Sequence, residues 1–294
     1  MKVAIYGQYY QNSTEPIIRD IFVFFNKNNV EMIIESEFLK LLYEKKIIQK
    51  EYQSFSSHTE LNSSFDMVIS IGGDGTILRA ATLVRQSGIP ILGVNAGRLG
   101  FLASVQKENI DVFLQFVIDK KYTLSPRTLL SLDCFPKNEG IFDLNFAMNE
   151  ITVSRKDTTS MITIETYLNN EYLNSYWADG LIISTPTGST GYSMSCGGPI
   201  LTPDVKSLVI TPIAPHNLNV RPLVIPDETE IRLKISGRSE QYLVSLDSRI
   251  ASIKNESVLT INKTPFKINM VEIPEETFLK TLRNKLLWGE DKRN

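Results

Sequence analysis

The stretch "DMVISIGGDGTILRAATLVR", residues 66–85, decides the fold class of this chain. Its apolar run at residues 66–71 is typical of a strand buried on both faces, and residues 77–85 carry a helical pattern. The glycine-rich turn at residues 72–76 joins the strand to the helix directly. A buried strand that passes through a short turn into a helix is the repeating unit of parallel α/β sheets.

The first 120 residues repeat this alternation of short apolar runs and helical patterns. Strands are expected at residues 3–6, 30–34 and 90–94, and helices at residues 16–25 and 36–42. Ser13 and Thr14 are candidates for the N-cap of the first helix. The sequence therefore predicts an N-terminal α/β domain with a parallel sheet.

From about residue 123 the pattern changes to period-two alternation, which favours strands of an all-β, sandwich-like domain. Such strands are expected at residues 129–135, 161–168, 230–235 and 241–246. Asn169 and Asn170 stand where a tight hairpin would turn. Residues 274–288 return to a helical pattern, and this helix is predicted to pack back on the first domain. The expected domains are residues 1–122 together with 275–294, and residues 123–274.

Composition limits the classes of function. With 42% hydrophobic and 22% charged residues among 294, the chain is an ordinary globular protein long enough for two domains. A net charge of −2 argues against broad binding to nucleic acid or to an anionic membrane. The chain has no apolar run long enough to span a bilayer and no signal-peptide pattern, so a cytoplasmic location is expected.

The supply of metal ligands and nucleophiles is also small. The two cysteines, Cys134 and Cys196, lie far apart and are interpreted as inert thiols in a reducing compartment. Two histidines exclude a histidine-rich metal centre, and neither Ser189 nor Cys196 lies in a nucleophile motif. We therefore expect any binding or catalysis by this chain to use a carboxylate, hydroxyls, backbone amides and a metal brought by the substrate.

The turn Gly72-Gly73-Asp74-Gly75-Thr76 is the strongest local signal for chemistry. Glycines let the backbone approach a phosphate, and the following helix directs its amides at an anion. A carboxylate repels phosphate, so Asp74 needs another role. It either coordinates Mg²⁺ carried by a nucleotide or accepts the proton of a hydroxyl that attacks phosphorus. The structural alternative is a helix cap in an ordinary turn.

Polar residues in the second half suggest a further binding surface. Asn149 offers a donor and an acceptor, and Glu150 can hold a ribose diol, although a strand-end turn also explains the pair. Asp179 is either a turn residue or an acceptor for a ligand. The segment "TPTGSTGYSMSCGGP", residues 185–199, carries more hydroxyls and glycines than a structural turn needs. We expect it to be an open, ligand-facing loop whose donors are satisfied by a polar ligand.

Four stretches taken together resemble the NAD kinase family: "GGDGT" at 72–76, "NE" at 149–150, "ADGLIISTPTGSTGYSMSCGGP" at 178–199 and "TPIAPHNLNVRPLVIP" at 211–226. The first stretch alone is shared with diacylglycerol kinases, sphingosine kinases and phosphofructokinases. Its combination with the TPTGST segment is highly specific. The resemblance extends from about residue 65 to about residue 250.

The resemblance implies that ATP phosphorylates the 2′-hydroxyl of the adenosine ribose of NAD, with Mg²⁺ or another divalent cation accompanying ATP. The α/β domain would bind the nucleotide, the β-rich domain would bind NAD, and the protein would form a homotetramer or homodimer. Asp74 would be the catalytic base, and the glycine turn with Gly72, Gly73, Gly75 and Thr76 would meet phosphate. The implied NAD-binding residues are Asp74, Gly75, Arg79, Phe101, Asn149, Glu150, Asp179, Thr190, Gly191, Tyr192, Ser193, Met194, Ser195 and Ala214.

Three positions depart from the family pattern. Gly191 replaces the usual alanine, Trp177 replaces a basic residue of some members, and Arg249 lies in a segment where many members read Asp-Gly-Gln. Two alternative functions remain open: a lipid or sugar kinase that shares GGDGT, and a non-catalytic protein that senses NAD or NADP.

Overall fold

The computed structural model describes residues 1–9, 14–97, 100–103, 105, 110–157, 160–274 and 276–289. The cap candidate Ser13 lies outside these residues. The chain divides into two compact units, Met1–Pro126 with Ile268–Asn294, and Arg127–Lys267. The second unit is a continuous insertion between the two parts of the first, and each unit is described by itself below.

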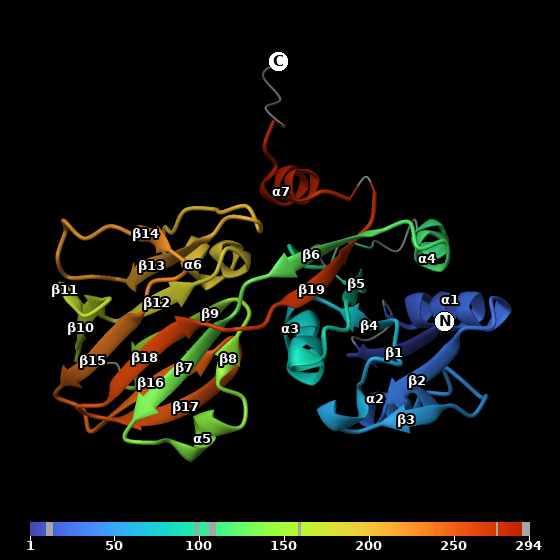
Figure 1. Ribbon diagram of the computed structural model, residues 1–294, viewed down its shortest axis with the longest axis horizontal. Coiled ribbons are helices and arrows are strands. Elements are labelled where there is room, and N and C mark those ends of the chain that lie inside the picture. The colour runs from blue at the N-terminus through green and yellow to red at the C-terminus, as the bar shows by residue number, and fades with distance from the viewer. Residues whose placement is uncertain are drawn as a thin grey trace. The chain divides into compact units, whose positions relative to one another are not determined.

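The first unit contains a seven-stranded sheet with the order β3-β2-β1-β4-β5-β19-β6 (Figure 1). Its strands are β1 (Lys2–Gly7), β2 (Glu31–Glu35), β3 (Gln53–Phe55), β4 (Met67–Gly72), β5 (Ile91–Asn95), β6 (Thr123–Arg127) and β19 (Ile268–Glu272). The pairs β1–β2, β1–β4, β2–β3, β4–β5 and β5–β19 are all parallel. The predicted parallel sheet is confirmed, and β19 adds a strand from the C-terminal part of the chain.

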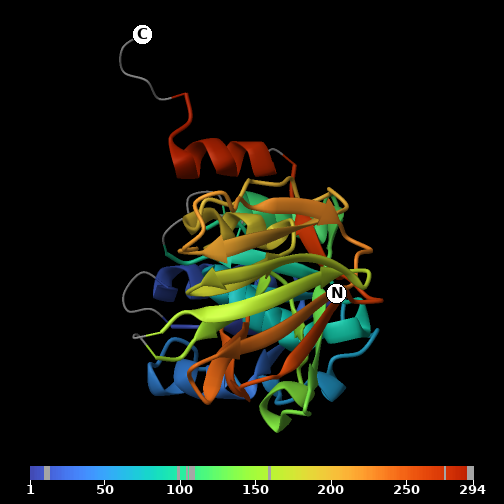
Figure 2. The same cartoon turned by 90° about the vertical axis from the view of Figure 1, so that its left-hand side faces the viewer.

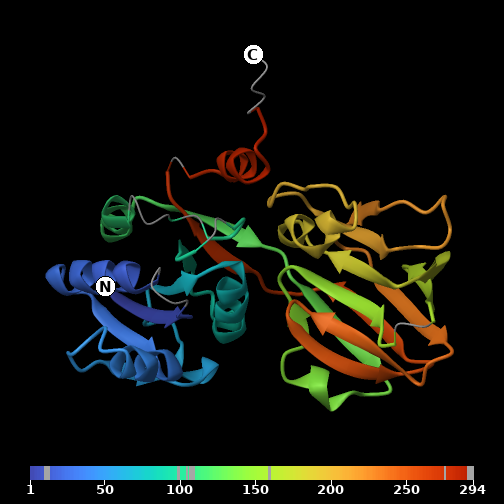
Figure 3. The ribbon, with the colours of Figure 1, turned by 180° about the vertical axis from the view of Figure 1, so that it is seen from behind.

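Helices α1 (Thr14–Lys27), α2 (Ser36–Glu44), α3 (Asp74–Val84), α4 (Ile110–Ile118) and α7 (Phe278–Leu286) complete this unit, with short 3₁₀ turns at His58–Glu60 and Arg85–Ser87. Helices α1 and α4 lie side by side (Figures 1 and 3). Their apolar residues share one core with Ile5, Ile69 and Val94 of the sheet. The parallel strands read as continuous apolar runs because helices shield them from water.

The C-terminal helix predicted over residues 274–288 is present as α7 and belongs to the first unit. It starts at Phe278 because the side chain of Thr277 accepts the N–H of Lys280, which caps the helix at that point. Leu282 is buried on its inner face.

The second unit consists of two six-stranded sheets, β11-β10-β15-β18-β7-β8 and β14-β13-β12-β9-β16-β17 (Figure 2). The first comprises β7 (Leu130–Phe135), β8 (Phe146–Ala147), β10 (Ile162–Leu168), β11 (Glu171–Ala178), β15 (Ile231–Gly237) and β18 (Val258–Lys263). The second comprises β9 (Glu150–Arg155), β12 (Gly180–Ser184), β13 (Ser207–Ile213), β14 (Leu223–Pro226), β16 (Gln241–Leu246) and β17 (Arg249–Lys254). Ile164 and Leu233 of one sheet share a core with Val153 and Ile183 of the other, which confirms the predicted sandwich.

Local sequence signals set the hairpins of the sandwich. Asn169 and Asn170 both adopt positive φ, 49° and 69°, between the antiparallel strands β10 and β11. Asparagine tolerates this left-handed conformation, which a tight hairpin turn requires. The hairpin predicted at these two residues is confirmed.

No helix within the described parts of the chain is both long and apolar enough to cross a bilayer.

Candidate active site

In the first unit, Asp74 lies at the start of α3, directly after β4, and its carboxylate reaches across to another segment. Its Oδ2 accepts the backbone N–H of Phe101 at 2.8 Å, and its Oδ1 accepts those of Leu102 and Ala103 at 3.0 and 3.3 Å. The N-cap of α3 is Gly73, and no side chain caps this helix end. The helix-cap interpretation of Asp74 is therefore wrong: its carboxylate orders residues 101–103 instead.

Gly100 makes this close approach possible. A Cβ atom at residue 100 would overlap both oxygens of the Asp74 carboxylate. Only glycine leaves the backbone close enough for the following three amides to converge on one side chain. The orientation of Asp74 therefore depends on a residue 26 positions later in the chain, which the motif at residues 72–76 does not reveal.

The rest of the glycine turn has a closed side and an open side. Thr76 is buried, and its hydroxyl donates to Oε1 of Gln8 at 3.3 Å, so it is occupied within the protein. In contrast, a Cβ atom at Gly73 or Gly75 would meet nothing within 4 Å. Arg79 is exposed four residues after Gly75, on the same face of α3. The open side thus combines a flat backbone surface with a guanidinium, which suits a phosphate.

In the second unit, Asn149 and Glu150 form a half-buried polar pair at the start of β9. Oδ1 of Asn149 and Oε2 of Glu150 are enclosed and have no hydrogen-bond partner among the described residues. An enclosed acceptor without a donor is costly, so these two oxygens mark a place for donors from a ligand.

The electrostatics of Glu150 point the same way. Burial, followed by the negative charge of Asp247, raises its pKa to about 8, although the backbone N–H of Tyr192 favours the ionised form. Glu150 is therefore largely protonated at neutral pH in the free protein. A ligand that supplies hydroxyl donors would favour its ionised form.

The segment at residues 185–199 is compact. It forms a 3₁₀ helix, η4 (Thr187–Thr190), and the short helix α6 (Tyr192–Ser195). The hydroxyl of Ser189 donates to the carbonyl of Pro186 at 2.7 Å, and that of Thr190 donates to the carbonyl of Thr187 at 3.2 Å. The hydroxyl of Ser193 lies 2.8 Å from that of Thr211.

These contacts overturn the expectation of an open loop whose hydroxyls await a ligand. Ser189, Thr190 and Ser193 are buried. The hydroxyls of Ser189 and Thr190 stabilise the 3₁₀ turn, and that of Ser193 connects α6 to Thr211 of β13. The groups left for a ligand are Tyr192 and Ser195, which are exposed, and Met194 and Gly191, which are half-buried. The binding surface of this segment is therefore an aromatic ring and the edge of a backbone turn.

Gly188 connects this segment to the polar pair. A Cβ atom at residue 188 would overlap the carbonyl group of Asn149, so the two backbones touch here. The N–H of Thr185 donates to that same carbonyl at 2.9 Å, and the Thr185 hydroxyl donates to the carbonyl of Met148 at 2.6 Å. The structure thus brings together residues 149–150 and 185–192, as the resemblance implies.

Asp179 directly precedes β12 and Ala214 directly follows β13, so the two residues lie next to each other. The backbone N–H of Asp179 donates to the carbonyl of Ile213 at 2.9 Å, and Ala214 is the next residue. The Asp179 carboxylate forms an ion pair with Arg155 at 3.0 Å and is only partly exposed. Burial, Cys196 and then Asp179 raise the pKa of the Tyr192 phenol, which indicates that Asp179 lies in the same neighbourhood.

Trp177, which replaces a basic residue of some family members, is half exposed. Its ring centroid lies 4.4 Å from that of His216, and the His216 N–H donates to the Trp177 carbonyl at 2.9 Å. A flat aromatic surface therefore stands at the position where some members of the resembled family carry a basic residue.

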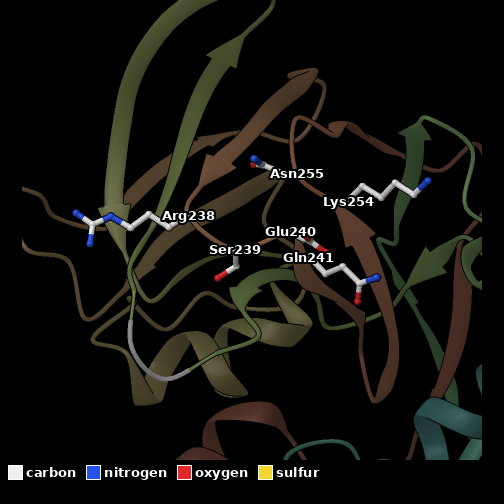
Figure 4. A pocket seen from close by; sticks show the side chains of 6 residues that line it. All are labelled: Arg238, Ser239, Glu240, Gln241, Lys254 and Asn255. Atoms are coloured by element: carbon white, nitrogen blue, oxygen red, sulfur yellow. The ribbon is translucent and has the colours of Figure 1, made fainter.

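A separate hollow of about 360 Å³ lies in the second unit, lined by Arg238, Ser239, Glu240, Gln241, Lys254 and Asn255 (Figure 4). None of the residues implied by the resemblance lines it. Figure 4 shows the side chains of Arg238 and Lys254 directed apart, so their charges do not converge on an anion. The described residues also contain no group of three or more His, Cys, Asp or Glu side chains that could hold a metal ion.

Comparison with known proteins identifies the family of the chain. The family model of the ATP-NAD kinase N-terminal domain matches residues 3–122, and that of the ATP-NAD kinase C-terminal domain matches residues 148–273. This chain belongs to the NAD kinase family. The family resemblance inferred from the four sequence stretches is thereby confirmed.

Within the NAD kinase family, an NAD kinase of Flavobacterium johnsoniae is 77% identical over 294 residues, which cover 100% of both chains. The NAD kinase of Archaeoglobus fulgidus, solved in complex with ATP, matches with a TM-score of 0.72 and 25% identity over 97% of each chain. Yeast NADH kinase, solved with NADH, has a TM-score of 0.88 and 22% identity, with 99% of this chain and 89% of that chain covered. At that identity the yeast enzyme shows the shared two-domain fold alone.

Sequence reasoning missed four contributors to the site. Gly100 lies beside Phe101, and Thr185 begins the hydroxyl-rich segment, but the sequence indicated no separate role for either residue. Asp247 matches the family pattern and was not assigned a role, and Arg249 was named only as a departure from that pattern. The available signal was weak: Asp247 directly follows an alternating strand, as many turn residues do.

Proposed function

We propose that this chain transfers the γ-phosphoryl group of ATP to the 2′-hydroxyl of the adenosine ribose of NAD, producing NADP and ADP. The observation that carries the proposal is the 77% identity to a NAD kinase over the whole length of both chains. The geometry of the two polar groups described above supports it. The named relatives support neither a lipid or sugar kinase nor a non-catalytic sensor.

Asp74 is the proposed base of the reaction. Its carboxylate offers about four lone-pair positions. Oδ1 accepts two backbone amides and Oδ2 accepts one, so Oδ2 retains a free acceptor position. The 2′-hydroxyl would give its proton to Oδ2 as its oxygen bonds to the γ-phosphorus and the bond to the ADP oxygen breaks. Phosphoryl transfer depends mainly on such alignment, which the three amides supply.

Most of the other residues are assigned either to phosphate or to one part of NAD. Gly73, Gly75 and Arg79 are assigned to phosphate or to the dinucleotide beside it, and Phe101 to the pocket wall. Gly72 and the buried Thr76 are assigned to shaping the turn. Asn149 and Glu150 are assigned to the adenosine end of NAD, where the ribose hydroxyls would satisfy their unpaired oxygens. Asp179 is assigned to the nicotinamide end of a dinucleotide on the same or a neighbouring subunit. Gly191, Tyr192, Met194 and Ser195 are assigned to direct contact with NAD, with Ala214 beside them. The buried Thr190 and Ser193 are assigned to holding the turns that present these groups.

Mg²⁺ is treated as part of the ATP substrate. The described residues provide no cluster for a resident ion. When bound to ATP, the ion neutralises charge on the phosphoryl oxygens.

The setting of the enzyme completes the proposal. We assign ATP binding to residues 1–122 with 275–294 and NAD binding to residues 123–274. The protein is proposed to be cytoplasmic and to form a homotetramer or homodimer. It is proposed to have no nucleic-acid or membrane partner, because a net charge of −2 provides no broad basic surface.

The test is to mix the purified full chain with NAD, ATP and Mg²⁺ and to measure NADP by an NADP-specific dehydrogenase. Sphingosine and fructose 6-phosphate are offered in parallel reactions. NADP formation is expected, with neither other acceptor phosphorylated. Calorimetric NAD binding without NADP formation would instead support the sensor, and phosphorylation of sphingosine or the sugar alone would support the kinase alternatives.

A further inference from the structure

Asp247 lies in the turn between β16 and β17, with φ of 54°, and its side chain is 5% exposed. Its carboxylate accepts the N–H groups of Met148, Asn149 and Glu150 at 3.0, 2.7 and 3.2 Å. Its own N–H donates to the carbonyl of Glu150 at 3.0 Å. In a regular strand successive N–H groups point to alternate sides, so three consecutive ones cannot meet a single partner. This carboxylate therefore defines the local backbone at the entrance to β9.

Arg249 holds the preceding part of the same segment. Its guanidinium donates to the carbonyl of Leu144 at 2.6 Å and to that of Phe146, and it stacks over the Phe146 ring at 5.6 Å. It also lies 4.0 Å from Oδ2 of Asp247. One residue thus binds carbonyls at 144 and 146 while the other binds amides at 148–150. The planar fork of arginine suits two carbonyls better than a single point charge would.

The segment held in this way carries the two unpaired acceptors of the second unit. Those two oxygens have no hydrogen-bond partner among the described residues, and the hydrogen bonds given above for Asp247 and Arg249 go to backbone atoms. Asp247 binds the backbone N–H groups of Asn149 and Glu150 themselves, and Arg249 binds the carbonyls of residues 144 and 146 just before them. We propose that Asp247 and Arg249 are positioning residues that fix the backbone of Asn149 and Glu150 and so orient both side chains toward the adenosine end of NAD. This inference rests on the proposed function.

The same geometry links Asp247 and Arg249 to the protonation of Glu150. The groups that face its carboxyl are Asp247 from the β16–β17 turn, with Arg249 behind it, and the Tyr192 backbone N–H from α6. Burial raises the pKa of Asp247 as well, while the three amides and Arg249 oppose that rise. Replacing Asp247 by a neutral residue removes one of the two causes that raise the pKa of Glu150.

The experiment compares full-length Arg249→Gln, Arg249→Lys and Asp247→Asn with wild type, and uses Arg238→Gln as the matched control. Arg238 is an exposed arginine in the same unit that lines the hollow of Figure 4. Calorimetric NAD affinity, the KM values for NAD and ATP, kcat and thermal unfolding are measured for each protein. Hydrogen exchange of the peptide covering residues 144–150 reports the backbone directly.

Arg249→Gln is expected to weaken NAD binding about tenfold, the usual scale for residues that orient a binding group, and to leave the KM for ATP unchanged. Arg249→Lys should lie between wild type and Arg249→Gln because lysine reaches one carbonyl only. Asp247→Asn should weaken NAD binding more, accelerate exchange at residues 144–150, and move the pH at which NAD affinity improves to lower values. Arg238→Gln should behave as wild type.

Two results would overturn the inference. Folded Arg249→Gln and Asp247→Asn proteins with unchanged NAD affinity would exclude a positioning role. A fall in kcat and thermal stability together with a parallel rise in both KM values, with no separate change in pH profile, would show a purely structural role. If the wild type does not bind NAD, both the proposed function and this inference are wrong. If the wild type binds NAD but forms no NADP, the proposed function is wrong, and the comparison of NAD affinities still tests the positioning role.

Discussion

The two carboxylates proposed to handle NAD, Asp74 and Glu150, contrast sharply in how they are satisfied. Asp74 is partly exposed, and both of its oxygens accept backbone amides of residues 101–103. Glu150 is mostly enclosed, one of its oxygens has no partner among the described residues, and its pKa is raised to about 8. A carboxylate held by several donors has a defined direction, which suits a base. A carboxylate that lacks donors can accept hydrogen bonds from a ligand, which suits the binding of NAD.

This contrast predicts that changes around Asp74 lower turnover, whereas changes around Glu150 alter NAD affinity. The largest effect is expected for Asp74→Asn, which removes the proton acceptor. Turnover should fall by a factor on the order of 10² or more, while the calorimetric affinity for NAD stays close to that of wild type. Asp111→Asn, an exposed residue in the first turn of α4, is the matched control. Turnover near the wild-type level in Asp74→Asn would refute the assignment of the base.

Gly100→Ala tests whether the direction of Asp74 matters as much as its charge. The added methyl group would overlap the carboxylate and displace it from the amides. Turnover should fall roughly 30-fold, because a misplacement of about 1 Å can cost as much as 10²-fold. Gly97→Ala is the control, since a Cβ atom there meets nothing within 4 Å. If Gly100→Ala keeps full turnover with a folded protein, the orienting role of these amides is wrong.

The pH dependence of NAD affinity tests the second half of the comparison. A pKa of about 8 means that free Glu150 is mostly protonated at neutral pH, and hydroxyl donors of NAD favour the ionised form. Binding therefore releases a proton, and affinity should rise by up to about tenfold per pH unit below pH 8 and level off above it. Calorimetry between pH 6.5 and 9 measures this.

Glu150→Gln supplies the control for the pH experiment, because the amide carries no titrating proton. Its NAD affinity should be weaker than that of wild type at pH 8.5 and nearly constant with pH. An identical pH profile in both proteins would assign the dependence to another group.

The smallest effect is expected for Gly191→Ala, which introduces the residue usual in the family. A Cβ atom at this position would lie 3.0 Å from Oε2 of Glu150 and 3.1 Å from the carbonyl of Gly188. The neighbours must shift by a few tenths of an ångström, so NAD affinity should change by roughly threefold, less than the 1.4 kcal/mol of a tenfold change. Titration calorimetry and steady-state kinetics measure it, and a loss of turnover without a change in affinity would contradict the division of roles.

Much of the fold could be predicted from local patterns. The alternation of apolar runs and helical segments predicted the parallel sheet, and period-two alternation predicted the sandwich, because each pattern reflects which faces of an element are buried. Asn169 and Asn170 predicted a hairpin because few other residues accept their conformation. Helix starts were less predictable: α3 begins at Asp74 and not at residue 77, since the glycine turn itself joins the helix.

The hydroxyl-rich segment at residues 185–199 shows where reading the sequence fails. Its composition indicated an open loop, yet Ser189, Thr190 and Ser193 turn inward to bond the protein. A hydroxyl can serve a turn or a ligand equally well, and composition does not distinguish these uses. The family assignment was nevertheless correct, because it rested on the order and spacing of motifs.

The sequence by itself determined the fold class, the family and the identity of the acidic residue in the glycine turn, because these depend on local periodicity and on residues close together in the chain. Only the tertiary structure decided what surrounds each carboxylate: the amides of residues 101–103 bind Asp74, whereas the carboxylate of Asp247, with Arg249 beside it, binds the backbone N–H of Glu150. Those partners lie roughly 30 to 100 positions away in the chain, and distances of this kind arise from the pairing of strands and the packing of turns, which no local pattern encodes.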